Sequence, residues 1–268
     1  MSQPTMKVDV DKCTVCYACF LACRDEYTGN DYLPLSAAQP PASQSWMRVE
    51  EIERGTFPKL KVSYIPIMCQ QCEDAPCIEA STDGAVYRRD DGIVIIDPEK
   101  AKGQKAIVDS CPYGVIFWNA EKALAQKCTF CAHLLEAGGE PRCIEACPVA
   151  AIQLAGDRLD EGEKLHPEFG LDPAVKYAGL PKNFVTGEVV IKSEDGEECA
   201  ANVTVVLKSD TEEHSTVTDI FGDFEFDGLT ELAGRILIIH HDGHAPIEIP
   251  LAGETSIDLG LIELGFGL

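Results

Sequence analysis

The stretch CTVCYACFLAC, residues 13–23, contains four cysteines at CxxCxxCxxxC spacing: Cys13, Cys16, Cys19 and Cys23. Thiolates that lie three residues apart on a tight turn can reach three corners of one [4Fe–4S] cluster. The fourth cysteine follows a short helical segment, so it points away and serves a second cluster. The stretch therefore predicts a fold of the bacterial-ferredoxin type, in which half-modules share clusters in pairs.

The same run recurs in altered form 88 residues further along the chain. Residues 9–13, DVDKC, match residues 97–101, DPEKA, and this shift carries Cys23 onto Cys111. Such repetition at a fixed shift indicates an internal repeat. Three ligand positions of the second run lack cysteine, and the residues found there are Ala101, Gln104 and Ile107.

Another pair of segments also repeats. Residues 76–81, PCIEAS, resemble residues 142–147, RCIEAC, and a CxxC pair precedes each of them, at 69–72 and 128–131. In the first segment Ser81 takes the place of the last cysteine. This part of the chain is thus predicted to consist of four ferredoxin-like half-modules in tandem, some of them degenerate.

Twelve of the thirteen cysteines lie between Cys13 and Cys147, and counting assigns them to clusters. Four complete half-modules would carry sixteen ligands and four clusters. If neighbouring modules pair, Cys147 has no cluster, and if the first pairs with the third, Cys23 has none. Only the nested pairing, first with fourth and second with third, uses every cysteine and assigns all four absent ligands to one missing cluster. It predicts three clusters, with ligands Cys13, Cys16, Cys19 and Cys147 for the first, Cys23, Cys128, Cys131 and Cys143 for the second, and Cys69, Cys72, Cys77 and Cys111 for the third.

The residues at the missing cluster should fill its space, because a void of that size would be costly. Ile107 supplies apolar bulk, and Ala101 lets the backbone close in. Gln104 and Ser81 are polar, so we expect hydrogen-bond partners or water for both.

Other interpretations of the cysteines are weaker. So many cysteines indicate either a disulfide framework or metal, but disulfide-dense chains are usually short and secreted. The last four of the twelve could by themselves hold zinc, whereas the first run and its repeats favour iron–sulfur clusters. Cys199 stands alone, so we expect a buried or half-buried structural thiol there rather than a ligand.

Charge and hydropathy exclude some partners. The formal net charge of −23 argues against binding to nucleic acid or to an anionic membrane surface. No stretch approaches the run of about 20 apolar residues that a membrane span requires, and the first residues do not resemble a signal peptide. We therefore expect a cytoplasmic protein, where thiols stay reduced and bind metal.

The pattern changes after the cysteine-rich part, and the chain is predicted to be of the α+β class. We expect a ferredoxin-like domain at 1–157 and a linker rich in Gly, Pro and charge at 158–184. Short alternating runs separated by turn residues then predict a seven-stranded antiparallel β-sandwich or barrel at 185–268. Part of this last region, residues 218–229, resembles transthyretin-like domains. The sequence does not predict a role for the long insertion at 25–66.

The cysteine pattern resembles that of the iron–sulfur electron-transfer subunits of molybdopterin oxidoreductases of the dimethyl-sulfoxide-reductase family. The resemblance covers roughly residues 6–157 and rests on the CxxCxxxxC pattern, the CPYG motif and the final CxxC…CxxxCP. Most members keep four clusters. In lacking the fourth cluster, the sequence resembles small subunits of the pyrogallol–phloroglucinol transhydroxylase type. Four segments share this resemblance: DGIVIIDPEK at 91–100, CPYG at 111–114, QKCT at 126–129 and CAHL at 131–134.

This resemblance implies a large catalytic partner that holds molybdenum on two pterin guanine dinucleotides. It implies a complex that acts on hydroxylated aromatics, by transhydroxylation or by reductive dehydroxylation of a catechol, while this chain has no catalytic residues of its own. Three alternatives remain open: a free-standing multicluster ferredoxin, a subunit of another molybdenum oxidoreductase, and clusters with a mainly structural role. Lys12 and Lys127 each precede a ligand cysteine, where their charge would favour reduced clusters, although solvation at the surface explains them equally well.

Overall fold

The computed structural model describes residues 3–41, 45–155, 162–193, 196–243, 245–253 and 255–265. The chain divides into two compact units. The first unit consists of Met1–Glu51 and Ser63–Leu180, and the second unit consists of Ile52–Val62 and Pro181–Leu268. Within the described part of the chain, no helix has both the length and the apolar character needed to span a membrane.

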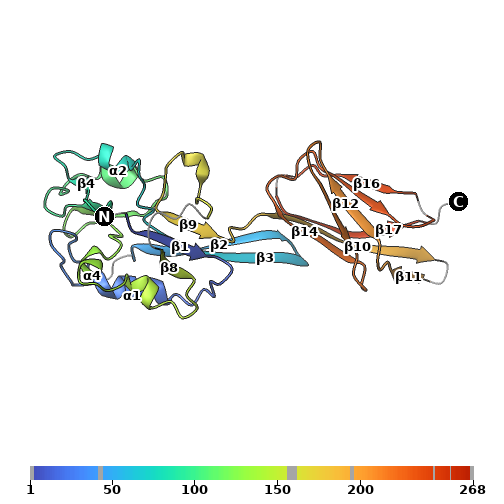
Figure 1. The fold of residues 1–268 in the computed structure, drawn as a ribbon, viewed down its shortest axis with the longest axis horizontal. Helices are drawn as coiled ribbons and strands as arrows, with labels where there is room; N and C mark the ends of the chain where they lie inside the picture. Colours follow the sequence, from blue (N-terminus) through green and yellow to red (C-terminus); the bar gives the residue numbers. More distant parts are fainter. Residues whose placement is uncertain are drawn as a thin grey trace. The chain divides into compact units, whose positions relative to one another are not determined.

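A three-stranded sheet with β1 at its centre anchors the first unit (Figure 1). Its strands are β1 (Thr5–Asp9), β8 (Ile152–Ala155) and β9 (Val175–Ala178). β1 runs antiparallel to β8 and parallel to β9. The sheet thereby joins the beginning of the ferredoxin-like sequence to its end.

The segment that the sequence suggests as a linker, 158–184, contains β9. Val175 and Tyr177 are both fully buried, and Val175 lies opposite Met6 of β1. So short an alternation of apolar residues does not stand out in a stretch rich in glycine and proline. The suggested boundary at 157 falls within 156–161, which lie outside the described residues.

Short helices and hairpins form the rest of the first unit. The helices are α1 (Ala18–Tyr27), α2 (Pro76–Glu79), α3 (Ala106–Asp109), α4 (Ala132–Glu136) and α5 (Arg142–Glu145), with a 3-10 turn at η1 (Pro167–Phe169). The hairpins pair β4 (Val86–Arg88) with β5 (Val94–Ile96) and β6 (Ile116–Asn119) with β7 (Leu124–Lys127). Helices α1 and α3 begin 88 residues apart, and α2 and α5 begin 66 apart. These are the shifts of the sequence repeat, so the repeat is structural.

Two four-stranded sheets form the second unit. One contains β10 (Asn183–Ser193), β11 (Gly196–Cys199), β14 (Asp223–Leu229) and β17 (Ile257–Leu264). The other contains β12 (Thr204–Lys208), β13 (Glu213–Val217), β15 (Ile236–His240) and β16 (Ile247–Pro250). Both contribute to one buried core, for which Val189 and Phe224 come from the first sheet and Leu207 and Leu237 from the second. The unit is therefore a β-sandwich rather than a barrel.

The expectation of seven antiparallel strands is wrong on two points. The described residues from 183 onward contain eight strands, because β11 adds one whose four residues are all exposed and show no apolar alternation. In addition, β17 runs parallel to β10, and a single-sequence pattern does not reveal strand direction. Cys199, at the end of β11, is also exposed rather than buried, because all the side chains of that strand face solvent.

The insertion at 25–66 forms a hairpin whose tip belongs to the second unit. Its strands are β2 (Met47–Thr56) and β3 (Lys59–Met68). The Lys61 ammonium lies 2.6 Å from a carboxylate oxygen of Glu225 and 2.7 Å from one of Asp227, both on β14. It also lies 4.9 Å from the centre of the Phe184 ring. The hairpin tip thus contributes a lysine that pairs with two acidic residues on β14 of the same unit.

Replacing Lys61 with methionine is expected to lower the free energy of unfolding of the second unit by about 1 kcal/mol. The change removes two ion pairs and a cation–π contact while keeping the aliphatic stem. Hydrogen exchange of the β14 amides measures the loss. Lys192→Met is the control, because the Lys192 side chain is 57% exposed, against 31% for Lys61, and its ion pair with Glu263 is open to solvent. Equal losses in the two variants would refute a specific role for the tip.

Candidate iron–sulfur sites

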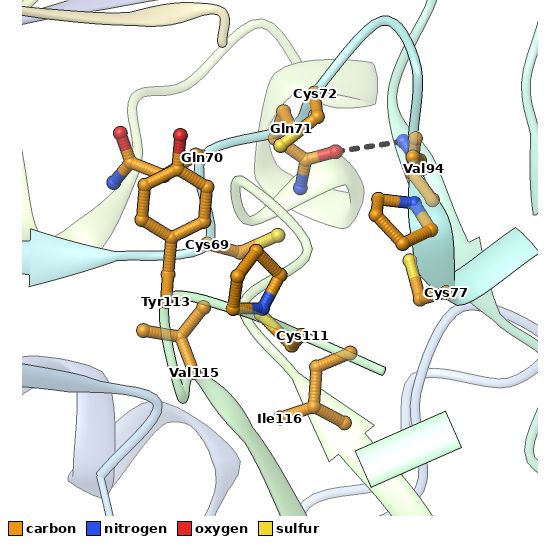
Figure 2. Close-up of a pocket in the computed structure, with 13 residues that line it drawn as sticks. Cys69, Gln70, Gln71, Cys72, Cys77, Val94, Cys111, Tyr113, Val115 and Ile116 are labelled. Atoms are coloured by element: carbon orange, nitrogen blue, oxygen red, sulfur yellow. Dashed lines mark hydrogen bonds between the residues drawn. The ribbon is translucent and has the colours of Figure 1, made fainter. Parts of the chain in front are cut away.

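A cavity in the first unit is lined by Cys69, Cys72, Cys77 and Cys111. It encloses about 350 Å³ of space between side chains, part of it open to solvent. Figure 2 shows the four side chains around this space, with Val94, Val115 and Ile116 also at its wall. We call these cysteines the third set. Four sulfurs around a largely apolar hollow are a suitable donor arrangement for a thiolate-bound cluster.

A similar cavity, of about 330 Å³, is lined by the first set, Cys13, Cys16, Cys19 and Cys147. Val15 and Tyr17 alternate with these cysteines and have φ values of 52° and 58°. This left-handed backbone curls the loop around the cavity. At the other side, the backbone N–H of Ala151 donates a hydrogen bond to Cys147 Sγ at 3.2 Å. An amide that faces a sulfur favours its anionic form.

The second set, Cys23, Cys128, Cys131 and Cys143, is buried in the same unit. Burial raises the pKa of Cys143 well above its usual range, and the neighbouring charges of Cys128, Cys131 and Cys23 raise it further. The four thiols therefore lie close enough to interact, and Cys19 of the first set is near enough to contribute as well. The N–H of Phe130 donates to Cys128 Sγ at 3.4 Å, as expected for a loop that wraps a cluster.

Burial has a chemical consequence for these thiols. It raises the pKa of Cys19 and Cys77 to about 11 and that of Cys23 and Cys72 to about 12. A bare site would therefore hold neutral thiols at pH 7, whereas iron is bound by thiolates. Protons must leave as the metal enters. Soft sulfur donors, apolar walls and amide donors to sulfur together fit [4Fe–4S] clusters.

The first and third of the predicted sets each line one cavity, and the second set is buried in the same unit. In particular, Cys147 lies with the first set, away from the grouping that a zinc site at the last four cysteines would need. Within the described residues, no three His, Cys, Asp or Glu side chains are close enough together to share a single metal ion. Cys199 belongs to the second unit and joins none of the sets.

The four positions that lack cysteine are filled by packing and hydrogen bonds. Ala101 and Ile107 are fully buried. Gln104 accepts a hydrogen bond from the N–H of Thr82 at 2.8 Å and donates to its carbonyl oxygen at 3.3 Å. Ser81 donates to a carbonyl oxygen of α2 at 2.8 Å. The prediction that Gln104 and Ser81 need partners is therefore confirmed.

A polar network beside the second set is not predicted from the sequence. Its centre is Glu26 of α1, whose side chain is 10% exposed. Glu26 accepts a hydrogen bond from Tyr32 at 2.6 Å and from Arg142 Nε at 2.7 Å, and His133 Nε2 lies 2.9 Å away. Burial alone would raise the pKa of Glu26, but these three partners lower it to about 2. The carboxylate thus ties the insertion and the last half-module to α1.

No sequence signal marks this network, because Glu26 lies 107 and 116 residues from His133 and Arg142. Its position nevertheless explains part of the insertion. The Tyr32 ring stacks on the His133 imidazole at 3.7 Å between centroids, and Trp46 packs against Tyr27 at 4.0 Å. The insertion therefore packs against α1 and α4 in addition to forming the hairpin.

Comparisons with known proteins agree with this geometry. The family of 4Fe-4S dicluster domains matches residues 60–158. The chain is 41% identical to the pyrogallol hydroxytransferase small subunit of Pelobacter acidigallici, over 98% of this chain and 100% of that protein. It is 34% identical to a subunit of the sulfite dehydrogenase of Allochromatium vinosum, over 68% of this chain and 84% of that protein. It is also 32% identical to a subunit of the tetrathionate reductase of Salmonella typhimurium, over 68% and 74%. The chain therefore belongs to the family of iron–sulfur electron-transfer subunits of dimethyl-sulfoxide-reductase-type molybdopterin oxidoreductases.

Proposed function

We propose that this chain conducts electrons through three [4Fe–4S] clusters to or from a large molybdopterin subunit. As a member of its family it is a non-catalytic iron–sulfur subunit, so the proposal concerns the number of clusters, their ligands and the partner. The observation that carries it is that the first and third sets each line a cavity and the second set is buried in the same unit, while the four remaining ligand positions are packed and hydrogen-bonded. Each set would hold one cluster, which supplies one-electron transfer.

The proposed order is first, second and third set. Helix α1 contributes Cys19 to the first set and Cys23 to the second, so these two sites adjoin along one helix. The charge of Cys69, from the third set, contributes to raising the pKa of Cys128 of the second, although burial is the larger cause. The second set is therefore the middle one. Since the fourth position is closed, the third set ends the series.

The proposed partner is a large subunit with molybdenum on two pterin guanine dinucleotides, acting on hydroxylated aromatics in the cytoplasm. Support for this substrate class is the identity to the pyrogallol hydroxytransferase small subunit, which extends over nearly the whole chain and includes the second unit. Transhydroxylation and catechol dehydroxylation both remain within the proposal. The second unit is proposed to be a transthyretin-like sandwich that assists assembly and holds no cofactor.

Anaerobic purification of a tagged chain, co-expressed with a large molybdopterin subunit, tests the proposal. The expected result is a complex that contains about twelve iron atoms on this chain, since three clusters hold four each. The large subunit purified alone is the control for iron that belongs to the partner. About eight or about sixteen iron atoms on this chain would contradict the count, and a chain that purifies without any molybdenum subunit would favour a free-standing ferredoxin.

A further inference from the structure

Lys127, the last residue of β7, has a fully enclosed ammonium group. Its side chain is 2% exposed. The Nζ atom donates hydrogen bonds to the carbonyl oxygens of Val94 and of Cys128, the latter at 3.2 Å. A lysine held by two backbone carbonyls in the interior has a defined position, so its charge has a defined position as well.

That position is the junction between the second and third sets. Cys128 is a member of the second set, and Val94 lines the cavity of the third. Gln71, in the loop between Cys69 and Cys72, bridges the same two residues. Its Nε2 donates to Cys128 O at 3.1 Å, and its Oε1 accepts from Val94 N–H at 2.7 Å, the bond drawn in Figure 2. Lys127 and Gln71 therefore connect the two cysteine loops at one point.

The charge of Lys127 has no carboxylate partner among the described residues. The ammonium lies beside cysteines of both sets, Cys69 and Cys77 of the third and Cys128 of the second. A buried charge without a counter-charge is strongly destabilising. The thiolate ligands of two clusters would supply that counter-charge from both sides.

We propose that the fixed positive charge of Lys127 favours the reduced states of both the second and the third cluster. The inference rests on the proposed function, since it assumes clusters in both sets. Each reduction adds one electron and one negative charge to a cluster, and no bond or proton at Lys127 changes. A fixed positive charge in a poorly solvated interior stabilises that added negative charge. Electrons that enter at the first cluster would therefore accumulate on the second and third clusters.

Lys12 provides a matched comparison. It precedes Cys13 of the first set as Lys127 precedes Cys128. However, its side chain is 54% exposed, and its ammonium lies 3.0 Å from a carboxylate oxygen of Asp9. Water and a paired carboxylate screen this charge, so its effect on the first cluster should be small.

The test is a potentiometric titration of the intact complex, followed by electron paramagnetic resonance. Lys127→Met is expected to lower the equilibrium constant for reduction of the second and third clusters at least tenfold, which is about 59 mV for a one-electron couple. Lys127→Arg, which keeps the charge, should stay within threefold of the wild type. Lys12→Met should change the first cluster less than twofold.

Lys127→Gln covers the case in which the methionine variant does not load iron, because the amide can still donate to the two carbonyls. Unchanged potentials in either neutral variant would overturn the inference. Loss of both clusters in the two neutral variants, with retention in Lys127→Arg, would support it, since charge rather than bulk then decides. Loss in all three variants would overturn it. The iron content of the wild-type complex is measured separately, so failure of the three-cluster proposal is distinguished from failure of the role of Lys127.

Discussion

Replacing Cys143 with alanine is expected to remove the middle cluster and to interrupt electron flow along the chain. Cys143 lies on α5, buried among Cys23, Cys128 and Cys131. Three thiolates leave one iron of a cubane without its protein ligand. Iron should fall from about twelve to about eight atoms per chain, and the resonance of one cluster should disappear. Reduction of the outer cluster from the partner's side should fall to background, because the second set lies between the other two.

Cys199→Ala is the matched control for this experiment. Cys199 is also a free cysteine, but it is exposed on β11 in the second unit. Its replacement should change neither the iron content nor the rate of reduction. Full electron transfer in Cys143→Ala would show that the proposed order of clusters is wrong.

Restoring four cysteines at the closed position should produce a fourth cluster. The variant carries Ser81→Cys, Ala101→Cys, Gln104→Cys and Ile107→Cys. Iron should rise from about twelve to about sixteen atoms per chain after reconstitution with iron and sulfide, with a fourth paramagnetic centre. Before reconstitution the first unit should be less stable by about 2–4 kcal/mol, because Ile107 loses apolar volume and Gln104 loses its hydrogen bonds to Thr82.

The triple variant that keeps Ala101 is the control, because its three new cysteines leave the site one ligand short of the four that a cube needs. It should show the loss of stability without gaining a stable cluster. Iron bound at this position in the unmodified chain would contradict the view that packing has replaced a cluster. If the fourfold variant folds but takes up no further iron, the closed position is not a remnant of a cluster site.

The cysteine loops could be predicted because the information in each loop is local. CxxC spacing predicts which thiols share a loop, and the repeat predicts which half-modules pair. Short-range patterns likewise identify strands such as β12 and β15, where buried and exposed residues alternate. The filled fourth position followed from the same repeat, since the register marks Gln104 and Ser81 as residues that need partners.

Other features depend on contacts that no short window contains. Glu26 meets Arg142 only after the chain has folded, and the acceptors of Lys127 include Val94, 33 residues earlier. β11 was missed because its residues are polar and exposed. The direction of β17 depends on which strand it meets, and its own sequence does not specify this. The sequence also left surface solvation open for Lys127, and only its burial decides against that interpretation.

The second unit is not continuous in the chain, since residues 52–62 complete a fold whose remainder begins at 181. During synthesis the hairpin tip leaves the ribosome more than a hundred residues before β14 does. Domains usually fold in the order in which they emerge, but this one must wait for its last segment. A chain cut short after residue 180 would leave Lys61 without Glu225 and Asp227. The hairpin tip of a truncated chain would therefore keep an unpaired ammonium, whatever the state of the cysteine sets in the first unit.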